Sequence, residues 1–317
     1  MAGKKYTYGI LINQLNFRLG LVFVLFTMAY SCSSDNIDVE VEEIEEEQVD
    51  PEDQVEEEEQ TSFNLPEIDL NNWKVTLPIS VNGKPIEVEP PEILNYATND
   101  VLKPFMFNDS INGALVFYAY PGATTTNSSY SRTELREQMN PGSNSTNWTF
   151  GQGGSMKGTL ALAEISKDND GDYHRTMVMQ IHGRLTNEQR DLIGESDNNA
   201  PPMLKIYWQD GYVRVLTKAL KNLNASDTEI LYTDAWEDGE SYTFSDKVDF
   251  DKFTIEIKVS EGKMEVILNE SDSKTFEDIH ILKWGVFENY FKAGNYLQTT
   301  DQEAFAKVKF YDLEVKH

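Results

Sequence analysis

The chain has 317 residues, with 54 Asp and Glu against 27 Lys and Arg, which gives a net charge of −27. A nucleic-acid-binding protein normally carries a basic surface, so this balance argues against that class. The only cysteine, Cys32, rules out a disulfide within the chain.

The first 32 residues have the pattern of a secretion signal. Lys4, Lys5 and Arg18 precede an apolar run from Leu19 to Ala29, which is too short to span a bilayer. The run ends in small residues and Cys32, and residues 29–32 resemble the lipid-attachment box of bacterial lipoproteins. We therefore predict a lipoprotein signal peptide over 1–32, lipid attachment at Cys32 and a membrane anchor; an inert thiol is the alternative.

Residues 33–61 form an acidic segment. Fifteen Asp and Glu and no Lys or Arg lie between Ser33 and Gln60. Such a segment buries too little apolar surface to offset the entropy of ordering, so we expect a disordered tether. Its position after Cys32 resembles the surface-export signal of Bacteroidetes lipoproteins. We therefore expect an exported protein on the outer membrane, facing the cell surface.

From residue 62 to the end, short segments rich in Val, Ile, Thr, Tyr and Phe alternate with Gly, Asn, Asp and Pro. This pattern predicts an all-β sandwich in one domain, 62–317. Hairpins are expected around Asp210-Gly211 and Glu261-Gly262. Single helical turns are expected at 91–96, 187–193 and 302–305. We expect the domain to be a monomer.

Three segments carry polar residues at alternate positions, so that these residues share one face of a strand. Taken singly, each segment also fits a solvated strand with ion pairs, a structural histidine, or a tyrosine packed under a loop. A glycine inside a strand, as at Gly294, often marks a bulge or the close approach of a ligand. The three sets are Arg132, Glu134 and Arg136; Gln180, His182 and Arg184; and Lys292, Tyr296 and Gln298.

These motifs, Arg-Thr-Glu-Leu-Arg at 132–136, Gln-Ile-His at 180–182 and Tyr-Phe-Lys-Ala-Gly-Asn-Tyr-Leu-Gln at 290–298, resemble in sequence and order the signature strands of the alginate lyases of polysaccharide lyase family seven. The resemblance implies a β-jelly-roll sandwich of two antiparallel sheets, with a concave face that binds alginate or a related anionic polysaccharide. It also implies catalytic roles for Arg132, Gln180, His182 and Tyr296. We predict that the substrate-binding residues are Glu134, Arg136, Arg184, Lys292, Asn295 and Gln298.

The implied reaction is a β-elimination, in which the substrate carboxylate is neutralised, the C5 proton is removed and O4 departs. Preorganised donors, namely Arg132, Gln180 and the ring of His182, stabilise the charge that develops on the carboxylate. Tyr296 is the candidate acid, and either Tyr296 or His182 is the candidate base. Ile181 between Gln180 and His182 resembles guluronate-acting members, so we expect a preference for guluronate-containing blocks.

No cofactor and no catalytic metal are expected, because the other histidines have no companions at metal-ligand spacing. Two further functions fit an acidic exported sandwich. A glycoside hydrolase needs two carboxylates across the bond, whereas the three polar faces offer only Glu134. A binding lipoprotein without catalysis has no use for the Tyr, His and Gln set.

Overall fold

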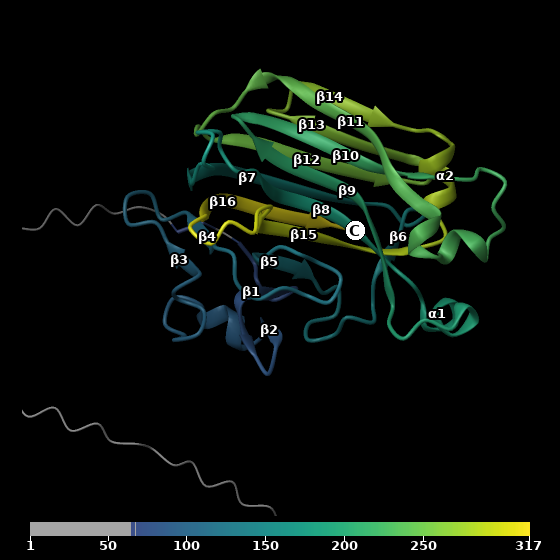
Figure 1. Ribbon diagram of the computed structural model, residues 1–317, viewed down its shortest axis with the longest axis horizontal. Coiled ribbons are helices and arrows are strands. Elements are labelled where there is room, and N and C mark those ends of the chain that lie inside the picture. Colours follow the sequence, from purple (N-terminus) through teal and green to yellow (C-terminus); the bar gives the residue numbers. More distant parts are fainter. Residues whose placement is uncertain (1–64, 67) are drawn as a thin grey trace, which may run out of the picture. The chain divides into compact units, whose positions relative to one another are not determined.

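The computed structural model describes residues 65–66 and 68–317 (Figure 1). The predicted signal peptide, Cys32 and the acidic segment 33–61 lie outside the described residues. Within the described part of the chain, no helix is long and apolar enough to cross a membrane.

The described residues form two antiparallel sheets, as predicted. The larger sheet has nine strands in the order β11 (Trp236–Lys247), β10 (Tyr212–Leu220), β9 (Asn199–Gln209), β8 (Thr176–Arg184), β15 (Glu288–Leu297), β5 (Arg132–Glu137), β1 (Trp73–Val81) and β2 (Lys84–Val88), with β6 (Trp148–Thr149) paired to β15. The smaller sheet has seven strands in the order β14 (Asp272–Phe276), β13 (Lys263–Leu268), β12 (Phe253–Ser260), β7 (Gly154–Ile165), β16 (Ala306–Lys316), β4 (Leu115–Ala119) and β3 (Met106–Asn108).

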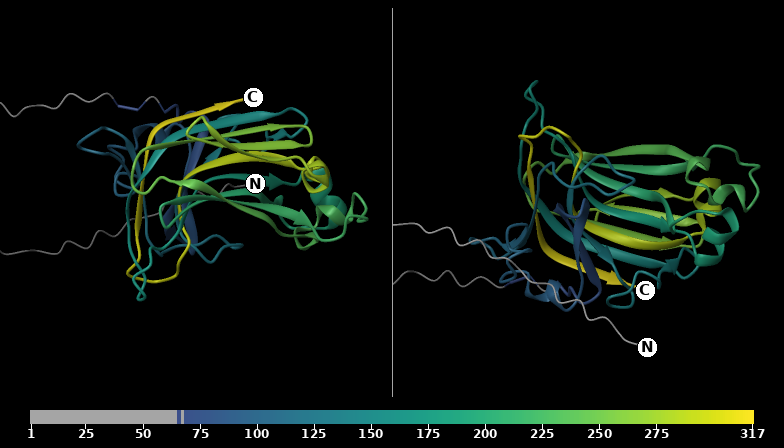
Figure 2. Two further views of the ribbon diagram at one scale, coloured as in Figure 1. Left: turned by 90° about the horizontal axis from the view of Figure 1, so that it is seen from above. Right: turned by 60° about the horizontal axis from the view of Figure 1, so that its bottom comes forward.

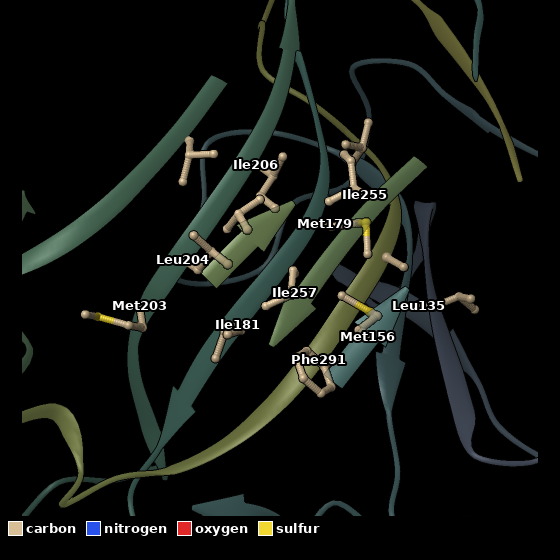
Figure 3. Packing of buried hydrophobic residues seen from close by; sticks show 14 of the residues in the cluster. Leu135, Met156, Met179, Ile181, Met203, Leu204, Ile206, Ile255, Ile257 and Phe291 are labelled. Atoms are coloured by element: carbon tan, nitrogen blue, oxygen red, sulfur yellow. The ribbon is translucent and has the colours of Figure 1, made fainter. Parts of the chain in front are cut away.

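The two sheets stack as the layers of a β-jelly roll, and their strands bend (Figure 2). The core lies between them and consists of side chains at alternate positions of facing strands. Met179 and Ile181 of β8 and Ile255 and Ile257 of β12 are all 0 % exposed, and they lie in this layer (Figure 3). Because alternate residues of a strand point to opposite faces, the residues between them on β8 must face the other way.

Both predicted hairpins are confirmed. Strands β9 and β10 pair antiparallel around Asp210 and Gly211, whose φ angles are +52° and +84°. Positive φ at both central residues is what a tight two-residue hairpin turn requires. Strands β12 and β13 pair in the same way around Gly262.

Helices are few and short in the described chain. The turn expected at 187–193 is α1 (Asn187–Ile193), which a capping box between Thr186 and Gln189 closes at its N-terminus. The turn expected at 91–96 is a 3-10 helix, η1 (Glu92–Asn95), whereas 302–305 forms none. Sequence periodicity does not predict α2 (Ile279–Trp284), because six residues are too few to show a helical period. Two further 3-10 turns are η2 (Glu229–Leu231) and η3 (Thr233–Ala235).

Candidate active site

The three polar motifs lie on β5, β15 and β8, which are neighbours in the middle of the larger sheet. Directly opposite residues of antiparallel strands share a face. The register pairs Tyr296 with Arg132, and Lys292 with both Arg136 and Gln180. These side chains therefore meet on the face of the larger sheet that points away from the core, which we call the open face.

Tyr290 pairs with His182 one step further along the same strands, and Glu288 pairs with Arg184. The four predicted catalytic residues thus come together on three adjacent strands. Of the two interpretations of Gly294, a bulge or the close approach of a ligand, the bulge is present as a register shift between Ala293 and Tyr296.

Glu134 lies at the centre of the open face and is only 1 % exposed. Its carboxylate accepts hydrogen bonds from Arg132 Nη1 (3.1 Å) and from Gln180 Nε2, and it forms an ion pair with Lys292 Nζ. Burial by itself raises the pKa of this carboxyl, but Lys292 and Arg132 outweigh that effect and hold the pKa below its usual range.

The substrate-binding role predicted for Glu134 stays a prediction. Its buried carboxylate already bonds to Arg132, Gln180 and Lys292, and its negative charge repels a polyanion. These contacts fit the role of orienting the donors around it.

His182 is held on two sides. Its Nδ1 lies 3.0 Å from the carbonyl oxygen of Gly183, and its ring stacks on Tyr290 with centroids 5.2 Å apart. Burial, together with the charge of Lys292, lowers the pKa of His182 to about 3, so the ring is neutral at neutral pH. Because a carbonyl oxygen only accepts hydrogen bonds, the single proton of the neutral ring lies on Nδ1 and leaves Nε2 as an acceptor.

Tyr296 is held by contacts to its ring and to its hydroxyl. The guanidinium carbon of Arg132 lies 3.7 Å from the ring centroid, and Tyr130 packs edge-on against the ring. The hydroxyl bonds to Ser128 Oγ, which itself donates to the carbonyl oxygen of Tyr130 (3.0 Å). Since Ser128 has only one proton to give, the Tyr296 hydroxyl is the donor toward Ser128.

The remaining predicted cations lie around this centre. Arg136 donates to the carbonyl oxygen of Glu137 (2.6 Å) and to Asn147 Oδ1 (3.0 Å), and its guanidinium carbon lies 4.1 Å from the ring centroid of Tyr290. Arg184 forms an ion pair with Glu288 (2.5 Å). Arg136 and Arg184 therefore border the His182 end of the site.

Gln298 follows the last residue of β15, at the Tyr296 end. Its side chain donates to the carbonyl oxygen of Tyr296 (3.0 Å), and its backbone N–H bonds to Arg175 (3.0 Å). Gln298 is half-buried and lies just beyond the end of β15, at the edge of the set of predicted residues.

Asn295 does not reach the open face. It is 0 % exposed, donates to the carbonyl oxygens of Phe117 (3.0 Å) and Ala306 (2.7 Å), and accepts a hydrogen bond from Thr176 (2.7 Å). The prediction that Asn295 binds substrate is wrong, because its amide ties the two sheets together inside the sandwich.

Sequence reasoning missed three parts of the site. Tyr290 shares the parity of Lys292, so alternation places it on the open face. Ser128 lies in a loop, where no periodic signal exists. Lys205, which pairs with Gln180, extends the cationic face onto β9 and bonds to Asp238 (3.0 Å). Among the described residues, no group of three or more His, Asp or Glu side chains is arranged to hold a metal ion.

Known proteins resemble this chain in sequence and in fold. The family described as alginate lyase matches residues 68–317. A complex of family 7 alginate lyase A1-II′ with substrate (GGMG) is 27 % identical, with a TM-score of 0.63 over 79 % of this chain and 94 % of that one. That protein is a double variant with one His replaced by Asn and one Tyr by Phe. A complex of the Tyr variant with product (GGG) is also 27 % identical, with a TM-score of 0.62 over 79 % of this chain and 96 % of that one.

The alginate lyase from Corynebacterium sp. is 24 % identical, with a TM-score of 0.55 over 79 % of this chain and 96 % of that one, and supports the fold alone. Comparison with curated protein sequences finds no match. The family match spans the whole described sandwich, including all three polar strands. The chain belongs to the alginate lyase family and is a polysaccharide lyase.

Proposed function

We propose that the open face performs the elimination with Arg132 and Gln180 on the uronate carboxylate, His182 as base and Tyr296 as acid. The observation that carries this assignment is that Arg132 and Gln180 converge on buried Glu134, with Tyr296 packed against Arg132 and His182 two residues along β8 from Gln180. Arg132 offers charge, and Gln180 has a second amide proton beyond the one bonded to Glu134. Donors that are already in place stabilise the charge that develops when C5 loses its proton.

His182 suits the task of base. Its neutral ring leaves Nε2 free to accept the C5 proton. Burial lowers the pKa of this ring most, and the charges of Lys292 and Arg132 add to the shift, so a uronate carboxylate beside these two cations raises the pKa and strengthens the base when substrate is bound. The electron pair of the C5–H bond then forms the C4–C5 double bond, and the C4–O4 bond breaks. This tautomer favours proton acceptance over donation to the carboxylate, the other role that the sequence left open.

Tyr296 suits the task of acid. Its hydroxyl carries a proton that it donates to Ser128 in the free protein, and redirecting this bond supplies the proton to the departing O4. The substrate complex of a relative carries replacements of one histidine and one tyrosine, the two residue types that we assign to proton transfer.

We propose a preference for guluronate-containing blocks. In guluronate the C5 hydrogen and O4 leave from opposite faces of the ring, which calls for two separate proton-transfer groups. His182 and Tyr296 lie on different strands and meet that need. Ile181 is fully buried, so it influences this preference only through the position of the strand.

Defined mannuronate and guluronate oligomers test the assignment. Wild-type protein is expected to release unsaturated, ultraviolet-absorbing ends faster from guluronate oligomers, and Arg132→Ala is expected to lower kcat about 100-fold or more. Equal rates on both oligomers contradict the block preference. An unchanged kcat in Arg132→Ala removes this residue from the site.

We also propose that the protein is a monomer held on the outer membrane, facing the cell surface, by a lipid on Cys32. The apolar run, the single cysteine and the acidic segment after it support this location. The wild-type protein is expected to enter the detergent phase in a phase-partition experiment. It is also expected to be cleaved by protease added to intact cells. A Cys32→Ser protein found equally in the detergent phase contradicts the anchor.

A further inference from the structure

Glu134 already binds the donors that a substrate carboxylate needs. Arg132 Nη1 (3.1 Å), Gln180 Nε2 and Lys292 Nζ all bond to it, from β5, β8 and β15. A protein carboxylate therefore occupies the centre of the cluster before any polymer binds. All four side chains are at least nine-tenths buried, so water does not replace these contacts.

This cluster has one positive charge in excess, which one more anion would neutralise. Arg132 and Lys292 carry two positive charges and Glu134 one negative charge, so the free cluster has a net charge of +1 and a uronate carboxylate brings it to zero. Without Glu134, two buried cations would face each other without compensation, which is costly in a medium of low dielectric constant.

Lys292 is the member of the cluster that can lose its charge. Burial lowers the pKa of its ammonium to about 8; Glu134 opposes this shift and Arg132 adds to it. The other charged or titratable groups that face it are Arg136 on β5, His182 on β8 and Tyr290 on its own strand. Among these groups, Glu134 is the anion in contact with Lys292.

We infer that Glu134 is a positioning residue that aims Arg132, Gln180 and Lys292 at the substrate carboxylate and keeps Lys292 charged until substrate arrives. This inference rests on the proposed function, in which these donors receive a uronate. The inference has a consequence of its own. Glu134 sets the pH above which Lys292 loses its positive charge, and the affinity for the polyanion falls with that charge.

The direct test follows the titration of Lys292 without substrate. The full chain is labelled with acetic anhydride over a range of pH, and acetylation of Lys292 is read by peptide mass spectrometry in wild type, Glu134→Gln and Glu134→Asp. Glu134→Gln keeps the shape and removes the charge, so the labelling midpoint is expected to fall by about one unit or more. Glu134→Asp keeps the charge and is expected to titrate close to wild type.

Kinetics give the second measurement. For a fall of one unit, the KM of Glu134→Gln for alginate is expected to rise about threefold at pH 7.5, where the charged fraction of Lys292 drops from about three quarters to about one quarter, with almost no rise at pH 6. An unchanged labelling midpoint in Glu134→Gln, or an equal shift in Glu134→Asp, overturns the inference. If the midpoint shifts and KM does not follow it, Glu134 still keeps Lys292 charged, and the role of Lys292 toward substrate is what fails.

A folding defect is also informative. If Glu134→Gln is recovered only as aggregate, the double variant Glu134→Gln/Lys292→Met removes both charges and is expected to fold. A double variant that also aggregates overturns the charge-balance argument.

Discussion

The imidazole ring of His182 lies nearly flat against the phenol ring of Tyr290, with ring centroids 5.2 Å apart and planes 15° from parallel. The two residues are direct partners across β8 and β15. The guanidinium carbon of Arg136, on β5, lies 4.1 Å from the centroid of the same Tyr290 ring. The plane of the candidate base is therefore set by a neighbouring aromatic ring as well as by the bond of Nδ1 to Gly183.

Removing that ring is expected to slow turnover more than binding. Tyr290→Leu leaves His182 free to tilt, and misplacing a catalytic group by about 1 Å lowers rates by 10-fold to 100-fold. Tyr290→Phe keeps the stacked ring and is the matched control, with kcat expected within about threefold of wild type. Steady-state kinetics on alginate decide between these outcomes, and a Tyr290→Leu enzyme with normal kcat contradicts the positioning role.

The low pKa of His182 predicts an activity profile that stays flat toward acid. Because this pKa is about 3, the base remains unprotonated between pH 7 and pH 5. We expect kcat/KM to change less than about twofold over this range. A tenfold loss per pH unit below about pH 6.5 would show that His182 titrates as an ordinary imidazole.

The same shift affects stability. In the unfolded chain the imidazole has its ordinary pKa of 6.5, so between pH 6.5 and about 3 the unfolded chain binds a proton that the folded protein does not. The free energy of unfolding is therefore expected to decline as the pH falls through this window. Urea titrations of wild type and His182→Gln measure the effect, and the variant is expected to show a smaller decline.

Replacing the candidate acid is expected to remove turnover and to leave binding intact. Tyr296→Phe deletes the proton for O4, and general acid catalysis contributes roughly 100-fold or more to the rate. Ser128→Ala removes only the partner of that hydroxyl and is expected to cost less than tenfold. Calorimetric binding of alginate oligomers to both variants is the control, and a Tyr296→Phe enzyme with near-normal kcat contradicts the assignment.

Asn295 is expected to matter for stability rather than for substrate affinity. Asn295→Ala removes the side-chain amide that donates to the buried carbonyl oxygens of Phe117 and Ala306, at a cost of roughly 3 kcal/mol in the free energy of unfolding. Asn169→Ala, at an exposed position, is the control, with an expected change within about 0.5 kcal/mol. A raised KM with unchanged stability would show that Asn295 acts in substrate binding instead.

Gly294 is expected to tolerate no side chain. Its φ is +135°, and an added Cβ would lie 2.7 Å from the carbonyl oxygen of Thr133 and 3.0 Å from Cα of Glu134. Gly294→Ala is therefore expected to push β15 away from β5 and to lower the free energy of unfolding by about 3 kcal/mol. Thermal unfolding of both variants measures the effect. Gly151→Ala, where the nearest atom to the added Cβ is 3.9 Å away, is the control and is expected to leave stability nearly unchanged.

The sequence by itself determined the fold class and the faces of the three polar strands. Alternation along a strand is local, so Arg132, Gln180 and Lys292 could be placed on one side of their strands before their neighbours were known. The same rule would have placed Tyr290 on that side and Asn295 on the other. The error at Asn295 came from giving a whole motif one role, although its residues alternate between two faces.

Only the tertiary structure decided what lies beside what, and how deep. That Glu134 is buried follows from β15 and β8 lying next to β5, a pairing between segments more than 40 residues apart in the sequence. The contact of Ser128 with Tyr296 joins a loop to a strand 168 residues away. Burial and distance set the pKa of His182 and Lys292, and both depend on neighbours that sequence periodicity cannot specify.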